Sequence, residues 1–150
     1  MENSKVILEE KTGEVKELRQ AVRNITLEKV DIFNDRMEML SETLEFNTRN
    51  KLYFTHPKYK HISSRGPIIG YDTKENNLCI YDLKDKCIKE ISMYNTEKEK
   101  ALFEEKFFGK YSFEDAMLGL ESADNLIDCV IKELTEYIEE EKRSLYKYKV

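Results

Sequence analysis

The sequence predicts an α+β fold in which a small three-stranded antiparallel meander, at about residues 67–92, packs with long N- and C-terminal amphipathic helices. Within the meander, short runs of β-branched and aromatic residues alternate with turn-forming residues. In the flanking segments, apolar residues recur three and four positions apart among many charges, which is the spacing of one helix face. At 150 residues the chain has the length of one domain, and we predict a single domain over residues 1–150.

The first long helix is predicted over residues 14–47. Its apolar residues keep a three-four spacing whose register slips by one near Thr26, so the helix is either continuous or broken at residues 24–26. Over the whole run the apolar repeat is nearer eleven residues than seven, which predicts a nearly straight stripe. Before this helix, residues 6–8 are predicted to form a short edge strand, with a helical lead-in as the alternative, and Thr12 is a candidate N-cap.

The meander is predicted from three apolar runs, at residues 67–71, 78–81 and 87–91, within the range 66–92. The two connections between them are short and contain Asn, Asp and Lys. Asn and Asp tolerate left-handed backbone conformations and bond to their own backbone, so both connections favour hairpins. A sheet this small is marginal in water by itself, and the flanking helices must cover it.

Two further helices are predicted after the meander. Thr96 followed three residues later by Glu99 is a capping box, which predicts a short helix over residues 97–108 that Gly109 ends. Residues 113–145 carry an apolar heptad repeat and are predicted to form the second long helix. Asp124 interrupts the apolar row, and we interpret it as a polar residue that fixes register.

Three strands cannot bury the stripes of two long helices, so we predict a homo-oligomer built through helices 14–47 and 113–145. The net charge of −5 argues against general nucleic-acid binding. No apolar stretch approaches the length of a membrane span, and the N-terminus lacks the pattern of a signal peptide. Three cysteines, an odd number with no C-x-x-C spacing, predict a reduced, cytoplasmic protein.

The main candidate for a functional site is the basic, aromatic segment 49–71. No acidic residue occurs between Phe46 and Tyr71, although the chain as a whole is acidic. Arginine forks and aromatic rings suit phosphates and stacked bases. We therefore predict a small anionic, nucleotide-like ligand, bound by Arg49, Lys58, Lys60, Arg65 and Tyr71. The alternative is that this segment pairs with the acidic helices of its own chain or of a partner.

Neither a metal nor a cofactor is predicted. The two histidines and the cysteines Cys79 and Cys87 match no common zinc module, and the Gly-rich and hydrolase motifs are absent from the sequence. Asp72, followed by Asp82 and Lys84, resembles the acid, hairpin, acid-x-Lys arrangement of metal-dependent nucleases, which requires two carboxylates on one divalent ion. Both acids also lie at turn positions, where Asp is common.

We accordingly predict a non-enzymatic oligomeric binding protein that captures a ligand or a partner. The alternative is an acidic protein inhibitor that acts on a basic target such as a nuclease. In size, acidity and a composition rich in Lys, Glu, Asn and Ile, the chain resembles small phage anti-defence proteins and toxin immunity proteins, and this resemblance implies such an inhibitor. A third hypothesis is a metal-dependent phosphoryl-transfer enzyme that uses Asp72 and Asp82.

Overall fold

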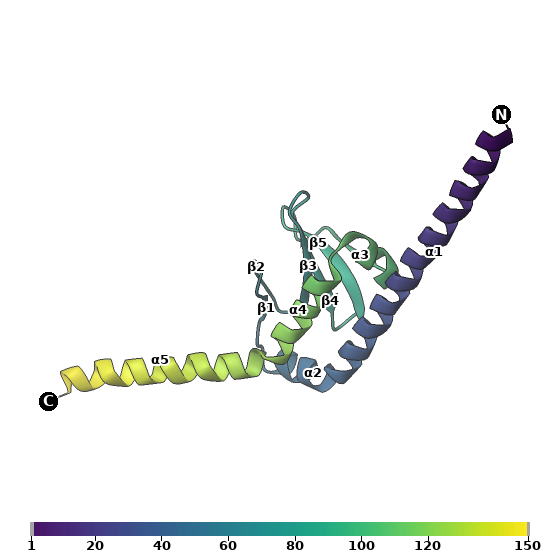
Figure 1. The fold of residues 1–150 in the computed structure, drawn as a ribbon. Helices are drawn as coiled ribbons and strands as arrows, with labels where there is room; N and C mark the ends of the chain where they lie inside the picture. The colour runs from purple at the N-terminus through teal and green to yellow at the C-terminus, as the bar shows by residue number, and fades with distance from the viewer. Residues whose placement is uncertain (1, 150) are drawn as a thin grey trace.

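The computed structural model describes residues 2–149 and confirms the α+β class (Figure 1). Met1 and Val150, which the single-domain prediction also includes, lie outside the described residues. The elements in chain order are α1 (Glu2–Met39), α2 (Ser41–Arg49), β1 (Phe54–His56), β2 (Tyr59–Ser63), β3 (Ile68–Asp72), β4 (Asn77–Asp82), β5 (Cys87–Ser92), β6 (Glu99–Leu102), α3 (Glu104–Lys110), α4 (Phe113–Asp124) and α5 (Leu126–Tyr148).

Four strands form one antiparallel sheet in the order β3-β4-β5-β6. In its register, Leu78 of β4 lies between Tyr71 of β3 and Ile91 of β5. In the first predicted turn Asn76 has the left-handed backbone conformation expected of Asn, with a φ of 56°, whereas in the second turn the positive φ, of 54°, falls on Lys86. The predicted meander is therefore present, but the predicted number of three strands is wrong.

The fourth strand replaces the first half of the predicted helix 97–108. Glu99–Leu102 pairs with β5, and helix α3 begins only at Glu104, with Phe103 at its N-cap. A capping box is a local signal, whereas the open edge of β5 offers a whole row of backbone hydrogen bonds to the same segment. The sheet edge outweighs the local preference, and the side chain of Glu99 is ion-paired instead of capping a helix.

A separate two-stranded hairpin, β1-β2, was not predicted. Phe54 lies opposite Ser63 and Thr55 opposite Ile62, with an irregularity before His56. Pro57 lies in the connecting turn, where its missing N–H costs no ladder hydrogen bond. The hairpin occupies much of the basic segment 49–71 and so decides where that segment's side chains lie.

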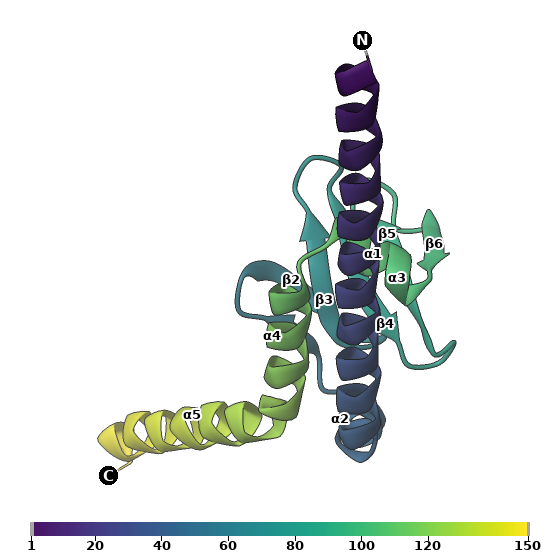
Figure 2. The same ribbon diagram turned by 45° about the vertical axis from the view of Figure 1, so that its right-hand side comes forward.

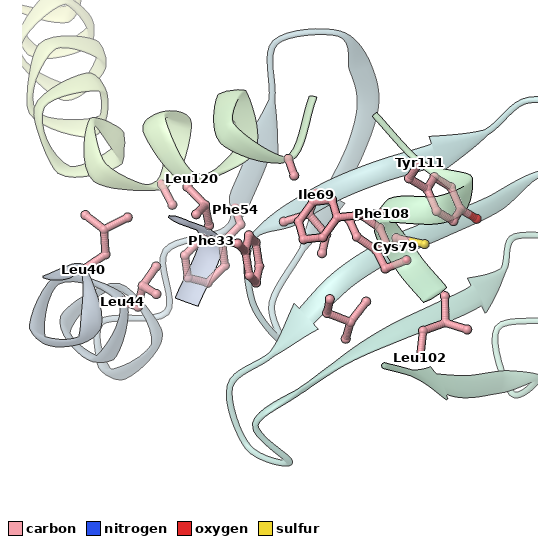
Figure 3. Packing of buried hydrophobic residues seen from close by; sticks show 14 of the residues in the cluster. Phe33, Leu40, Leu44, Phe54, Ile69, Cys79, Leu102, Phe108, Tyr111 and Leu120 are labelled. Atoms are coloured by element: carbon pink, nitrogen blue, oxygen red, sulfur yellow. The ribbon is translucent and has the colours of Figure 1, made fainter. Parts of the chain in front are cut away.

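Helices α1, α3 and α4 cover one face of the four-stranded sheet (Figure 2). At their meeting point the fully buried Phe33 of α1 packs edge-on against Phe108 of α3, with ring centroids 5.5 Å apart. Ile69 and Cys79 of the sheet lie in the same buried cluster (Figure 3). A second, smaller cluster contains Ile68, Leu78, Ile80 and Ile91. Because neighbouring strand residues point to opposite faces, this second cluster lies on the other face of the sheet.

The N-terminal helix is longer than predicted and is broken elsewhere. Residues 6–8 belong to α1, so the predicted edge strand is wrong, and the hydroxyl of Thr12 donates to the carbonyl of Leu8 inside the helix instead of capping it. The helix is continuous at residues 24–26 and ends at Met39, after which α2 begins. The predicted single helix over 14–47 is therefore two helices, and α2 turns so that the amide of Asn47 donates to the carbonyl of Ala123 in α4.

The predicted helix over 113–145 is also two helices. α4 ends at Asp124, the chain turns at Asn125, and α5 continues to Tyr148. Asp124 is exposed at this break and does not lie in a continuous apolar seam. Before the break, α4 lies so close to β3 that a Cβ at Gly119 would stand 1.9 Å from the carbonyl oxygen of Ile68.

Two helical arms project from the compact head formed by residues 30–126 (Figures 1 and 2). The first arm is residues 2–28 of α1, and the second arm is residues 127–148 of α5. The arms leave the head in different directions, and nearly all of their residues are exposed. None of the described helices combines the length and the apolar character that crossing a membrane requires.

The close approach of α4 to β3 generates a test of the fold. Gly119→Ala should lower the free energy of unfolding by about 1–3 kcal/mol, since the new methyl group meets a backbone carbonyl that cannot move aside cheaply. Urea denaturation followed by circular dichroism measures the change. Gly13→Ala is the matched control, because nothing lies within 4 Å of its added Cβ and the midpoint should stay unchanged or rise. Equal loss in both variants would contradict the packing described.

Candidate functional site

A pocket with a volume of about 810 Å³ lies beside the basic segment. The end of α2, the loop after β2, the β4-β5 turn, and strands β5 and β6 line it. Its charged lining residues are Glu45, Arg49, Arg65, Asp82, Lys84, Asp85, Lys89 and Glu99. Four basic and four acidic side chains thus meet around one open space.

Arg65 organises one side of this pocket. Its guanidinium donates to Asp82 at 2.6 Å and to Glu99 through both of its terminal nitrogens. Lys89 adds contacts of 3.5 Å to Asp82 and 3.2 Å to Glu99, and it also pairs with Asp85. These five residues, which we call the ion-pair network, join the loop after β2 to three strands of the sheet.

Electrostatics within the ion-pair network favours the charged forms. Hydrogen bonds from Arg65 and then Lys89 hold the pKa of Glu99 at about 2. Burial by itself would raise the pKa of Asp82, but the hydrogen bond from Arg65 and those from the backbone of the following turn outweigh burial and lower it. The pKa of Arg65 is raised, first by its bond to Glu99 and then by its bond to Asp82. Arg65, Asp82 and Glu99 therefore remain ionised at neutral pH.

The local sequence explains how Asp82 is positioned. Its other carboxylate oxygen accepts backbone N–H groups of Lys84 at 3.0 Å and Asp85 at 3.4 Å, which is the turn-stabilising role that Asp performs well. Lys86 completes the turn with a positive φ. One carboxylate thus closes the hairpin and anchors Arg65 at the same time.

The other side of the pocket has unpaired positive charge. Arg49, the last residue of α2, and Lys84, in the β4-β5 turn, both line the pocket, and within residues 2–149 neither makes an ion pair. Both side chains are exposed. An anion that entered the pocket would therefore find two cations that make no ion pair within residues 2–149, and two, Arg65 and Lys89, that already have partners.

The structure brings together only two of the five predicted ligand-binding residues. Arg49 and Arg65 line the pocket, but Lys58, Lys60 and Tyr71 do not. Lys58 pairs with Asp115 at 2.7 Å. Tyr71 donates its hydroxyl to Asn76, and Lys60 is exposed on β2. Lys58 thus matches the alternative in which the basic segment pairs with acidic helices of its own chain, whereas the acids paired with Arg65 lie in the strands β4 and β6.

A cluster around Asp115 fastens the β1-β2 hairpin to α4. The hydroxyl of Tyr59 donates to the carboxylate of Asp115 at 2.8 Å, beside the ammonium of Lys58. His56 Nδ1 accepts the backbone N–H of Lys58, so its Nε2 carries the proton and donates to the Asp115 carbonyl oxygen at 2.7 Å. Burial lowers the pKa of His56, which favours this neutral form. These contacts are internal to the head and satisfy one another.

The geometry does not support a joint metal site at Asp72 and Asp82. Asp72 lies opposite Asn77 at one end of β4, and Asp82 is at the other end of that strand. Five residues of extended chain separate the two ends by about 17 Å, so the two carboxylates cannot bind one ion. Within residues 2–149, moreover, no three His, Cys, Asp or Glu side chains are grouped so that they could hold a metal ion.

Several pocket residues were not predicted from the sequence. Lys89 is an ordinary strand residue in the sequence, and Glu99 appears there as part of a capping box. Their convergence depends on β6 pairing with β5, which brings Glu99 opposite Ile91 and near Lys89. The one local signal was Asp82 in a turn that also contains Lys84 and Asp85.

Comparison with known proteins provides no relative from which a role could be transferred. No protein-family model matches the chain, no curated protein matches it, and no solved structure matches it. The functional argument therefore depends on the pocket and on the arms.

The ion-pair network predicts a specific acid sensitivity. The folded-state pKa of Glu99 is below its unfolded value, so its contribution to stability is complete above about pH 4.5 and is lost as the pH falls toward 2. Asp82 and Glu90 have lowered pKa values as well and act in the same direction. Urea midpoints measured between pH 7 and pH 2.5 should fall steeply below about pH 4.5.

The variant Glu99→Gln should show a shallower loss of stability in this acid range, because it removes one group that must be protonated. Glu97→Gln is the matched control, since Glu97 makes no ion pair within residues 2–149. The same steep acid limb in wild type and Glu99→Gln would refute the role assigned to this carboxylate.

Proposed function

We propose that the protein is a non-enzymatic, oligomeric binding protein whose arms associate with other chains and whose head presents the charged pocket to a ligand. The observation that carries this proposal is the apolar surface of the two arms. Each arm is an amphipathic helix with its apolar stripe in solvent, on a chain whose head is already folded around a separate core.

The stripe of the first arm continues the face of α1 that packs on the head. Val22 and Phe33 are eleven residues apart in α1, which returns to nearly the same side of the helix. Phe33 is fully buried, but Val22 is 63% exposed. The remaining apolar residues of this stripe are also exposed, namely Leu8, Val15, Leu18 and Ile25.

The second arm carries a heptad row. Ile131, Leu134, Ile138 and Leu145 recur at alternating intervals of three and four, apart from one miss at Glu141, and each is at least half exposed in the single chain. Helices of this kind derive most of their stability from packing their apolar face. Association with another chain would bury both rows, and the heptad spacing suits a helical partner.

Placing a carboxylate in each stripe tests the role of the arms. An ionised Asp in an apolar seam costs about 2 kcal/mol or more, so Val22→Asp and Ile131→Asp should raise the dissociation constant of the oligomer at least about 30-fold. Sedimentation-velocity measurements over a concentration series give this constant. A wild-type protein that stays monomeric at high micromolar concentration would overturn self-association.

Matched controls exist on the polar side of each arm. Gln20→Asp and Cys129→Asp introduce the same charge one helical turn or less away, at exposed positions outside the apolar rows. Both controls should assemble like wild type. If they dissociate as strongly as the stripe variants, the effect arises from added charge and not from the apolar surface.

For the ligand, we propose a small anion, nucleotide-like in charge, in the pocket. Arg49 supports this proposal because it lines the pocket without an ion pair within residues 2–149, whereas Arg65 and Lys89 maintain the shape of the pocket through the ion-pair network. Lys84 is the second available cation. Lys58, Lys60 and Tyr71 are not part of this narrower site.

Native mass spectrometry of protein purified without denaturant should reveal a retained anion, and calorimetric titration with pyrophosphate and with ADP should show binding. Arg49→Gln should weaken that binding at least tenfold, because a charge-assisted hydrogen bond contributes about 1.5–3 kcal/mol. Lys60→Gln removes a charge from the same basic segment, outside the pocket, and should leave the affinity unchanged. The reverse pattern would place the ligand elsewhere.

The second candidate function is inhibition of a basic protein. Between residues 126 and 141 the second arm has six acidic residues and one lysine, for a net charge of −5. This acidic surface supports docking on a basic target. A ligand-free protein that captures a basic protein, and loses it when Glu133, Glu136, Glu139 and Glu140 are changed to Gln, would favour this candidate over the small anion.

A further inference from the structure

The charge of the second arm changes sign along its length. Residues 126–141 have a net charge of −5, whereas residues 142–149 contain four basic residues and no acidic one, for a net charge of +4. Both halves belong to the same continuous helix α5, which ends at Tyr148. The arm is therefore an amphipathic rod with an acidic half near the head and a basic half at its tip.

We propose that the occupant of this apolar row is the α5 helix of a second copy of the chain, in antiparallel orientation. In that arrangement the acidic half of each copy lies along the basic half of the other. In a parallel pair, acid would face acid and base would face base. The proposal depends on the proposed function only in taking the arms as association surfaces, and it adds the partner and its direction.

The arrangement of the molecule leaves room for such a pair. α5 turns away from the head at Asn125, and no other element within residues 2–149 runs alongside it (Figures 1 and 2). The row from Ile131 to Leu145 spans the sign change of the charge, so apolar contact and charge complementarity act over the same residues. Only Glu141 interrupts this row. Opposed helix dipoles also favour the antiparallel pair.

A distance measurement on Cys129 decides the orientation. Cys129 is exposed on α5, Cys79 is fully buried with its pKa raised to about 12 by burial, and Cys87→Ser removes the remaining thiol. If α5 pairs about its midpoint, the two Cys129 labels are about sixteen residues apart along the axis, or about 24 Å. Because Cys129 lies on the polar side of the helix, both labels point away from the partner and are about 22 Å apart across the pair. Electron–electron double resonance should therefore give a distance centred at about 33 Å for the antiparallel pair. A parallel pair places both labels at one level and gives about 22 Å, which would overturn the proposal.

A mixed sample provides the matched control. Arg143→Cys, in a chain that lacks Cys87 and Cys129, places a label on the same helix side as Cys129, two heptads further on. Antiparallel pairing brings Cys129 of one copy and the label at position 143 of the other to nearly the same level, so this mixture should give the short distance. Parallel pairing separates the two labels by about 21 Å along the axis.

Charge exchange tests the cause of the orientation. Changing Lys142, Arg143, Lys147 and Lys149 to Glu makes the whole arm acidic and should weaken the dimer at least tenfold at low salt, with less effect at high salt. Adding the changes Glu133→Lys, Glu136→Lys, Glu139→Lys and Glu140→Lys reverses the gradient and should restore self-pairing. This reversed chain should not pair with wild type in native mass spectrometry. Mixed dimers would indicate parallel pairing and overturn the proposal.

The failure of this proposal can be distinguished from failure of the proposed function. If Val22→Asp dissociates the oligomer and Ile138→Asp does not, the first arm is the interface, so the proposed function stands and the α5 pair is wrong. If the wild-type protein is monomeric at every concentration, both the proposed function and the α5 pair are wrong. If Ile138→Asp dissociates the oligomer and the distance between two Cys129 labels is the long one expected of the antiparallel pair, the proposed function and the α5 pair are both supported.

Discussion

The structure depends on the convergence of three helices on one face of a four-stranded sheet. Phe33, from a helix that begins at the N-terminus, reaches the same cluster as Phe108 and the sheet residue Ile69. The remaining lengths of α1 and α5 extend beyond this cluster, and nearly all of their residues are exposed. At 38 and 23 residues, about 57 Å and 35 Å, both helices are much longer than the strands of four to six residues that they flank.

The ion-pair network compensates a buried charge in the head. Asp82 is buried, and a buried carboxylate is costly unless its charge is compensated and its lone pairs are bonded. Arg65 and Lys89 provide the charge, and the turn N–H groups provide the remaining bonds. Because these cations are already engaged, the free charge of the pocket is restricted to its α2 and turn sides. Electrostatics therefore divides one pocket into a structural half and a half available to a ligand.

Local patterns in the sequence predicted the fold class and the central strands, since β-branched runs and Asn or Asp turns are signals that act over a few residues. They did not predict β6, because the capping box at Thr96 and the edge of β5 compete, and only the folded sheet reveals the edge. Both helix breaks, at Leu40 and Asn125, were also missed because the apolar spacing of the sequence is almost continuous across them. At the pocket, Arg49 and Arg65 stood out as basic residues, whereas the positions of Lys89 and Glu99 follow from strand pairing.

The break at Asn125 also has a consequence for avidity. It directs α5, which at 23 residues is about 35 Å long, away from the pocket-bearing head. If two such helices lie along each other, the heads are held at opposite ends of a stiff spacer, and their two pockets have a set separation. A target that displays two suitably spaced groups would then be bound bivalently, with the second contact strengthened by a high effective concentration. A monomer, with one head and one pocket, cannot bind two groups of a target at the same time.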